Sequence, residues 1–250
     1  MVAAHAQMRS VNLFRESLAF AETRGMNSAL LEQRAGLGTL PKCYWDFFSL
    51  ACQNRRVHPS CARMITLLIG TNRPNNNSRK IARHIEEIYA ELKVPLRVMD
   101  LGDLPPEIFL PSSYAEKPRS FQPFAEGILR SSGVHVISPE YNGGIPGVLK
   151  YFIDMLKFPE SFERRPVCFT GIAAGIWGAL RPIEQLQAIF GYRNAFIYPE
   201  RVFLPQVNSL LDQNGRLTNP ELLERLQKQA AGFVDFVEKV KQINLRETKP

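Results

Sequence analysis

From residue 64 onward, short apolar segments alternate with segments of helical period, and this alternation restricts the fold more than any other feature of the chain. Apolar runs predict strands over 64–69, 96–101, 133–138, 167–170 and 195–198. Segments with helical spacing predict helices over 78–93, 121–130, 146–156 and 181–190, and a last helix that Asn219 caps and Pro220 begins. Five strands that alternate with five helices indicate right-handed βαβ units, and therefore a parallel α/β sheet covered on both faces.

In such an open sheet, a ligand lies beyond the carboxyl ends of the strands, where the strand order reverses. The loops expected there follow the first, third and fourth predicted strands. The first loop, 70–78, offers the hydroxyls of Thr71 and Ser78, the guanidinium of Arg73 and a helix start behind them. These groups suit a phosphate. The alternative is a polar loop with an ordinary serine cap. The loop matches neither GxxxxGK[ST] nor GxGxxG, which disfavours a P-loop NTPase and a standard dinucleotide-binding domain.

The other two loops carry little side-chain bulk. The loop after the third strand contains Gly143 and Gly144, and Pro146 stands where the first residue of a helix is expected. The loop after the fourth strand contains Gly175 and Gly178. Two loops of bare backbone beside a phosphate loop fit a flat ring system that carries one phosphate. Their amides could stabilise negative charge on that ring.

At these residues the chain resembles the NADPH-dependent FMN reductase family, which is similar to flavodoxin in fold and includes quinone, chromate and azo-dye reductases. The first motif reads GTNR at 70–73 with Ser78 as its serine, and the second reads PEYNGGIPGVLK at 139–150, followed by Asp154. The resemblance covers about residues 64–200. It implies a flavodoxin-like three-layer sandwich with a five-stranded parallel sheet of order 2-1-3-4-5.

Carried over position by position, the resemblance implies a site for non-covalent FMN. Thr71, Arg73 and Ser78 would hold the phosphate, and Gly175 would approach one edge of the isoalloxazine. The residues expected to line the ring are Pro139, Glu140, Tyr141, Asn142 and Gly143. The chain departs from the family at Gly144, where many members have serine, and at Tyr151, where asparagine is common.

The resemblance implies an oxidoreductase that works by a ping-pong reaction. NAD(P)H would give a hydride to the flavin, and a quinone, azo compound, metal oxyanion or free flavin would then accept electrons. No catalytic side chain and no metal are expected, because the cofactor carries the chemistry. The alternative is a flavodoxin-type carrier of single electrons, although such carriers tend to be strongly acidic. A third alternative is an interaction module whose flavin site has decayed.

Several residues near these loops have two interpretations. Glu140 is a general acid or base or, as we favour, a structural carboxylate, and Trp177 is a lid or an interface residue. His84 is expected on the polar side of its helix, and His135 is expected to be structural. Lys150 and Asp154 form an i, i+4 pair. Arg181 and Arg193 are candidate partners for the 2′-phosphate of NADPH. The family implies a homodimer or homotetramer, to which three phenylalanines could contribute: Phe152, Phe158 and Phe162.

Residues 1–63 have little sustained period, and we expect them to be a weakly structured or dispensable extension, with Met64 as the functional start. They hold eight basic and four acidic residues, whereas 64–250 hold 23 and 20, so the body is near neutral and nucleic acid is not expected as a partner. Cys43, Cys52, Cys61 and Cys168 lack the close pairs of a zinc site and suit a reducing compartment. No apolar run approaches the ~20 residues that span a bilayer, and no signal peptide is evident, so we expect a cytoplasmic protein.

Overall fold

The computed structural model describes the backbone of residues 64–247 and the side chains of residues 64–243. Expectations for residues 1–63, including the three cysteines of that segment, lie outside the described residues. The described part contains a five-stranded parallel sheet of order β2-β1-β3-β4-β5, which confirms the predicted fold class and strand order. The strands are β1 (Ile65–Ile69), β2 (Leu96–Asp100), β3 (Gly133–Pro139), β4 (Pro166–Ile172) and β5 (Phe196–Leu204).

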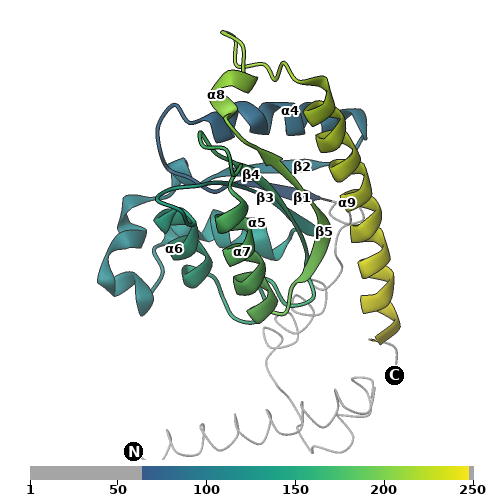
Figure 1. Ribbon diagram of the computed structural model, residues 1–250. Helices are drawn as coiled ribbons and strands as arrows, with labels where there is room; N and C mark the ends of the chain where they lie inside the picture. Colours follow the sequence, from purple (N-terminus) through teal and green to yellow (C-terminus); the bar gives the residue numbers. More distant parts are fainter. Residues whose placement is uncertain (1–63, 248–250) are drawn as a thin grey trace, which may run out of the picture. The chain divides into compact units, whose positions relative to one another are not determined.

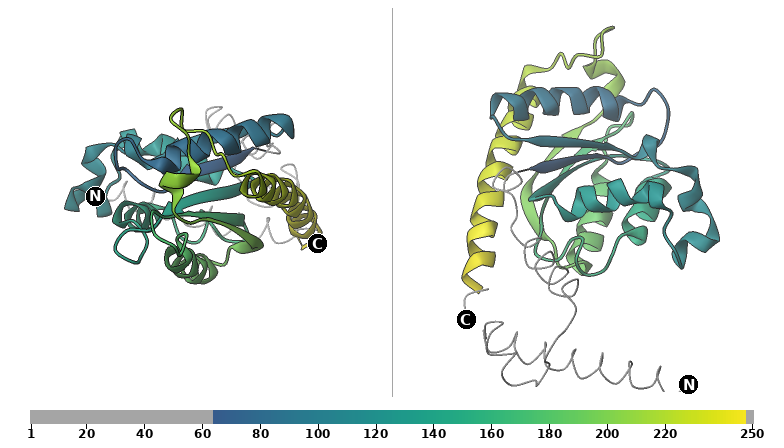
Figure 2. Two further views of the ribbon diagram at one scale, coloured as in Figure 1. Left: turned by 45° about the horizontal axis from the view of Figure 1, so that its top comes forward. Right: turned by 180° about the vertical axis from the view of Figure 1, so that it is seen from behind.

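Helices cover both faces of this sheet (Figures 1 and 2). One face carries α4 (Asn77–Glu91) and α9 (Pro220–Glu247), and the other carries α5 (Gln122–Leu129), α6 (Gly147–Met155) and α7 (Leu180–Tyr192). The short helix α8 (Val207–Leu210) follows β5. The segment between β2 and α5 contains four 3₁₀ turns: η2 (Leu101–Asp103), η3 (Pro106–Phe109), η4 (Pro111–Tyr114) and η5 (Arg119–Phe121).

The central strands explain why the apolar runs were a reliable signal. Every residue of β1, β3 and β4 is buried. Strands covered on both faces read as nearly continuous apolar runs, because both faces pack against helices. The side chains separate into two cores, one under α5, α6 and α7 and one under α4 and α9.

Strand β5 is longer than the predicted 195–198. Pro199, Glu200 and Arg201 hid its second half, because proline and charged residues are unusual inside a strand. β5 is an edge strand, and its pairing with β4 shifts register between Val167 and Phe169 of β4. An edge strand tolerates such residues because one side of its backbone needs no ladder partner.

Two local expectations were wrong, for Pro146 and His84, and the serine cap of the alternative interpretation is also not observed. Pro146 is the cap residue of α6 rather than its first helical residue. Asn76, and not Ser78, caps α4, because the Asn76 side chain accepts a hydrogen bond from the Arg79 backbone N–H at 2.8 Å. His84 is buried rather than exposed, and its Nε2 accepts a hydrogen bond from the Leu217 backbone N–H at 3.0 Å.

A buried chain of hydrogen bonds runs from α4 across β3 and β4 to α9, and it identifies His135 as a structural residue. The Tyr89 hydroxyl lies 3.1 Å from His135 Nδ1, and His135 Nε2 lies 2.9 Å from Thr170 Oγ1. Thr170 donates to Gln229 Oε1 at 2.8 Å, so His135 Nε2 must donate to Thr170 and Nδ1 must accept from Tyr89. Gln229 in turn donates to the backbone oxygens of Phe169 and Glu200. The chain runs in one direction with a neutral imidazole, and it ties α4 and α9 to β3 and β4.

We expect this imidazole to make folding sensitive to acid. Burial lowers the pKa of His135 from 6.5 to about 3. Below pH 6.5 the unfolded chain gains a proton at His135 that the folded chain does not. The folded state therefore becomes less stable as the pH is lowered. The free energy of unfolding should fall by about 1.4 kcal/mol per pH unit from this group alone, or about 2 kcal/mol by pH 5. Urea unfolding at pH 7 and pH 5 measures this change. An equal loss in a folded His135→Gln variant would contradict the assignment.

Candidate functional site

The carboxyl ends of β1, β3 and β4 bring the three predicted loops to one edge of the sheet. Gly70 is the first residue of the first loop, and it lies close to β3 because its backbone N–H donates to Ile137 O at 2.8 Å. A Cβ on Gly70 would lie 2.8 Å from that oxygen and 2.8 Å from a methyl group of Leu149. A larger residue would therefore separate β1 from β3 and α6.

The first loop combines buried hydroxyls with an exposed cation. Thr71 and Ser78 are buried, and Arg73 is exposed at the tip. The first turn of α4 leaves backbone N–H groups without partners inside the helix. The loop is held in shape by Asn76, whose side chain also donates to Arg73 O at 2.6 Å. Backbone donors, two hydroxyl residues and one exposed guanidinium are therefore all carried by this loop and the first turn of α4.

A hydroxyl contact joins the first loop to the second. Thr71 Oγ1 and the Tyr141 hydroxyl are 2.7 Å apart, and Thr71 Oγ1 also accepts from the Arg73 backbone N–H at 3.1 Å. Both residues were predicted to contact the cofactor, but neither was predicted to contact the other. The two residues are 70 positions apart in the sequence, and no local sequence pattern predicts their contact.

The second loop contains a tight two-residue turn. Tyr141 and Gly144 exchange backbone hydrogen bonds of 3.1 and 3.0 Å, and Asn142 and Gly143 both have positive φ, 51° and 75°. This is the pattern of a type I′ turn, for which Asn-Gly is a preferred sequence. Gln185 of α7 supports the turn by accepting from the Ile145 backbone N–H at 3.1 Å. Gln185 is a positioning residue that the sequence did not reveal.

The third loop is exposed and yet anchored at both ends. Ala174, Gly175, Ile176 and Trp177 are exposed. Gly175 O accepts a hydrogen bond of 3.0 Å from the backbone N–H of Gln206, after β5. A Cβ on Gly175 would meet nothing within 4 Å, so the space beside it is open. The loop thus presents bare backbone toward the same edge of the sheet as the other two.

Glu140, at the end of β3, carries a buried oxygen with no partner. Its backbone N–H extends the ladder to Ile172 O at 3.1 Å, and its Oε1 accepts from Arg181 Nη1 at 3.0 Å. Its Oε2 is buried, and among the described residues it has no hydrogen-bond partner. A buried acceptor of this kind calls for a donor from a ligand. The pair also identifies Glu140 as an anchored carboxylate.

The donor set fits FMN at both of its ends. Its phosphate would meet the hydroxyls, the guanidinium and the N–H groups of the first loop, and its flat ring would meet two loops with exposed backbone. The isoalloxazine has one N–H group, which could donate the hydrogen bond that Glu140 Oε2 does not receive from the described residues. The open space at Gly175 agrees with such a ligand.

Other predicted residues lie away from this edge or are inaccessible. Phe152 and Phe162 are buried in the core, so they cannot supply a subunit contact, whereas Phe158 is exposed. Arg193 is buried and donates to the backbone oxygens of Ile153 and Lys157, which removes it as a partner for a 2′-phosphate. The Lys150–Asp154 pair is confirmed at 2.6 Å. Cys168 is a buried free thiol whose pKa is raised by burial.

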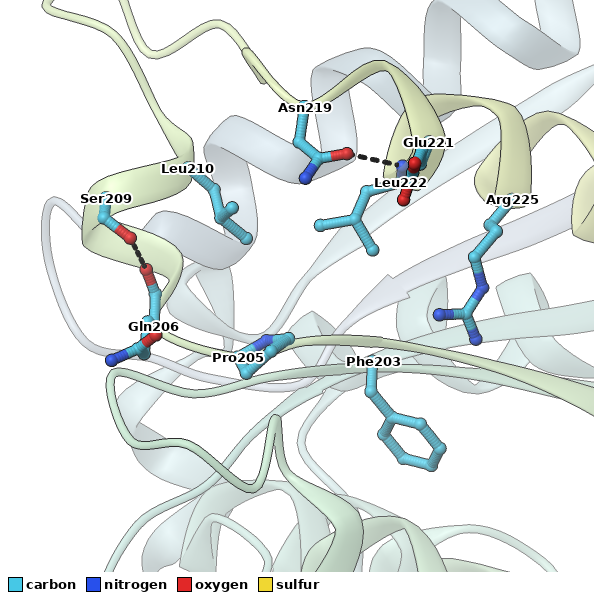
Figure 3. Close-up of a pocket in the computed structure, with 9 residues that line it drawn as sticks. All are labelled: Phe203, Pro205, Gln206, Ser209, Leu210, Asn219, Glu221, Leu222 and Arg225. Atoms are coloured by element: carbon cyan, nitrogen blue, oxygen red, sulfur yellow. Dashed lines mark hydrogen bonds between the residues drawn. The ribbon is translucent and has the colours of Figure 1, made fainter.

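A separate cavity of about 410 Å³ lies between the end of β5, α8 and the start of α9 (Figure 3). Asn219 caps α9 there by accepting from the Leu222 backbone N–H at 3.0 Å, as predicted. None of the predicted cofactor residues lines this cavity. Three of its lining residues, Phe203, Pro205 and Gln206, also lie beside the third loop.

Comparison with known proteins decides the family. The chain matches the NADPH-dependent FMN reductase family over residues 64–209. The chain belongs to this family. A quinone reductase of Pseudomonas putida is 28% identical over 62% of this chain and 84% of its own length, and one of Escherichia coli K12 is 26% identical over 71% and 96%. The flavoenzyme NAD(P)H:(acceptor) oxidoreductase FerB of Paracoccus denitrificans has the same fold, with a TM-score of 0.61 and 23% identity over 71% of this chain and 98% of its own.

Membership in the FMN reductase family confirms the expected cofactor chemistry. FMN is the cofactor, NAD(P)H is the reductant, and the chain is an oxidoreductase rather than the flavodoxin-type carrier kept as the alternative. Among the described residues, no helix is long and apolar enough to cross a membrane, and no group of His, Cys, Asp or Glu is placed to hold a metal ion.

Proposed function

We propose that the chain couples the oxidation of NAD(P)H to the reduction of a quinone, with bound FMN as the redox group. The observation that carries the proposal is that the loop with Thr71, Arg73 and Ser78 meets two loops of exposed backbone at one edge of the sheet. The names of the relatives point to the acceptor. Two of them are quinone reductases, and a Burkholderia relative at 22% identity is named 2-hydroxy-1,4-benzoquinone reductase.

In this proposal the first loop binds the phosphate end of the cofactor. Arg73 supplies a charge-assisted contact, Thr71 and Ser78 supply hydroxyls, and the start of α4 supplies backbone N–H groups and a favourable dipole. The hydroxyl contact between Thr71 and Tyr141 keeps this loop in register with the second loop.

The second and third loops orient the ring. The ring-lining residues are Pro139, Glu140, Tyr141, Asn142, Gly143 and Gly175. The rigid type I′ turn fixes the backbone groups of Asn142 and Gly143 before the ligand arrives, which lowers the ordering cost of binding. When bound, FMN supplies hydride acceptance and donation, so no side chain of this chain is assigned a proton transfer.

An anaerobic experiment tests the proposed acceptor. The FMN-loaded chain should be reduced by NADPH or NADH, and the reduced protein should then be mixed with a quinone, an azo dye, chromate and free FMN. We expect reoxidation to be fastest with the quinone. Equal or faster reoxidation by another acceptor would reassign the substrate, and no reduction by either nucleotide would remove the proposed function.

The proposal extends to assembly, location and the first 63 residues. We propose a homodimer or homotetramer and a cytoplasmic location, where NAD(P)H is supplied, and sedimentation of the full chain tests the assembly. We also propose that residues 64–250 form the whole FMN-binding unit. Expression of 64–250 alone should then give soluble protein that retains FMN, and insoluble or flavin-free protein would contradict this boundary.

A further inference from the structure

Arg181, in the first turn of α7, reaches from the second loop to the third. Its Nη1 donates to Glu140 Oε1 at 3.0 Å, and its Cδ would lie 3.8 Å from a Cβ placed on Gly143. Its guanidinium carbon lies 5.6 Å from the centre of the Trp177 ring. Arg181 therefore stands between the two loops that the proposed function assigns to the ring.

The guanidinium of Arg181 keeps most of its binding capacity. Its side chain is 51% exposed, whereas that of Glu140 is only 12% exposed. Of its five N–H donors, the described residues engage one, through Nη1. The ion pair thus holds the guanidinium, while its other N–H groups have no hydrogen-bond partner among the described residues.

Trp177 adds a flat apolar surface beside this cation. Its side chain is 56% exposed, and the preceding Ile176 is 67% exposed. The two side chains are adjacent in the third loop, so they place exposed apolar surface next to the guanidinium of Arg181. Gly178, with φ 58°, fits tightly against Phe203 and Pro205, so the turn that carries Trp177 is held from behind. The aromatic ring is therefore presented by an anchored loop.

We propose that Arg181 and Trp177 form the specificity site for an anionic aromatic electron acceptor: a planar ring that carries an ionised hydroxyl, carboxylate or sulfonate group. The ring would pack beside Trp177, and the anion would take the N–H groups of Arg181 that Glu140 leaves unused. A guanidinium is suited to this task because its planar fork binds oxyanions with two parallel hydrogen bonds and stacks on aromatic rings. This inference rests on the proposed function, since it names the class of acceptor that reaches the same site.

Equilibrium binding tests the inference without relying on turnover. The FMN-loaded full chain is titrated in a calorimeter with naphthalene-2-sulfonate and with the uncharged naphthalene-2-sulfonamide. We expect the sulfonate to bind about ten- to hundredfold more tightly. Arg181→Gln should abolish this ratio, and Arg181→Lys should retain part of it, because lysine keeps the charge but not the fork. Trp177→Ala should weaken both ligands together.

Controls distinguish failure of this inference from failure of the proposed function. Arg97→Gln removes the same charge from β2, at the other side of the sheet order, and should leave the ratio unchanged. FMN content is measured for every variant, so that a loss of cofactor is not read as a loss of the anion site. A ratio that survives in FMN-loaded Arg181→Gln overturns the inference. Failure of the wild-type protein to oxidise NAD(P)H with any quinone overturns the proposed function instead.

Discussion

Replacement of Gly175 by valine should weaken FMN binding about ten- to hundredfold, because overpacking of this size costs about 1–3 kcal/mol. The reason is the open space beside Gly175, where an added side chain would meet no protein atom within 4 Å. If the ring edge of FMN occupies that space, only the ligand is displaced. The melting temperature of the flavin-free protein should stay the same. Fluorescence titration with FMN and thermal unfolding without it measure the two effects.

A matched control exists in the same protein. Gly191, near the end of α7, also has no atom within 4 Å of an added Cβ, and it lies at the opposite end of that helix from the site. Gly191→Val should leave FMN affinity unchanged. Unchanged affinity in Gly175→Val would place the ring elsewhere. A large loss of stability in that variant would show that the space is filled by the protein itself.

Replacement of Arg73 by glutamine should weaken FMN binding by a similar factor but leave riboflavin binding unchanged. Hydrogen bonds to charged groups contribute about 1.5–3 kcal/mol, which is about a ten- to hundredfold change in affinity. Riboflavin has the same ring system and no phosphate, so the ratio of the two affinities isolates the contact. Titration of the flavin-free protein with each flavin measures this ratio.

A control variant removes a positive charge elsewhere, on α4. Arg83 is also exposed on α4 and lies beyond the first turn of the helix. Arg83→Gln should therefore leave the FMN-to-riboflavin ratio unchanged, and Arg73→Lys should restore part of it. If Arg73→Gln lowers the affinity for both flavins equally, the arginine shapes the loop rather than binding phosphate.

The sequence was sufficient for the sheet because the central strands obey a simple constraint. Strands buried on both faces are nearly continuous apolar runs, and this pattern can be read without knowing their neighbours. β5 breaks the pattern because an edge strand accepts Pro199 and charged residues, and its length was accordingly underestimated.

Side-chain partners were harder to predict because they depend on contacts between distant segments. Arg193 looked like an available cation, but the rings of Phe158 and Phe162 lie beside it. The guanidinium carbon is 5.2 Å from the centre of each ring. Phe152 looked available for a subunit contact, but it faces the core side of α6. The Glu140–Arg181 pair spans 41 residues, and the sequence contains no local sign of it.

The three loops were identified from the sequence because each directly follows a recognisable strand. Their chemistry could be read from residue types: hydroxyls and arginine in the first loop, and glycine-rich turns in the other two. Their mutual support could not be read in this way. The contacts of Tyr141 with Thr71 and of Ile145 with Gln185 arise only when β1, β3 and α7 are packed together.

The most direct test of the central claim, that these loops form one FMN site for hydride transfer, is flavin retention followed by anaerobic reduction. The purified full chain is incubated with FMN, desalted and titrated with NADPH while its absorbance is recorded. We expect stoichiometric flavin after desalting, bleaching of its absorbance by NADPH, and recovery of that absorbance when a quinone is added. A colourless protein after desalting, or a bound flavin that neither NADPH nor NADH reduces, would contradict the claim.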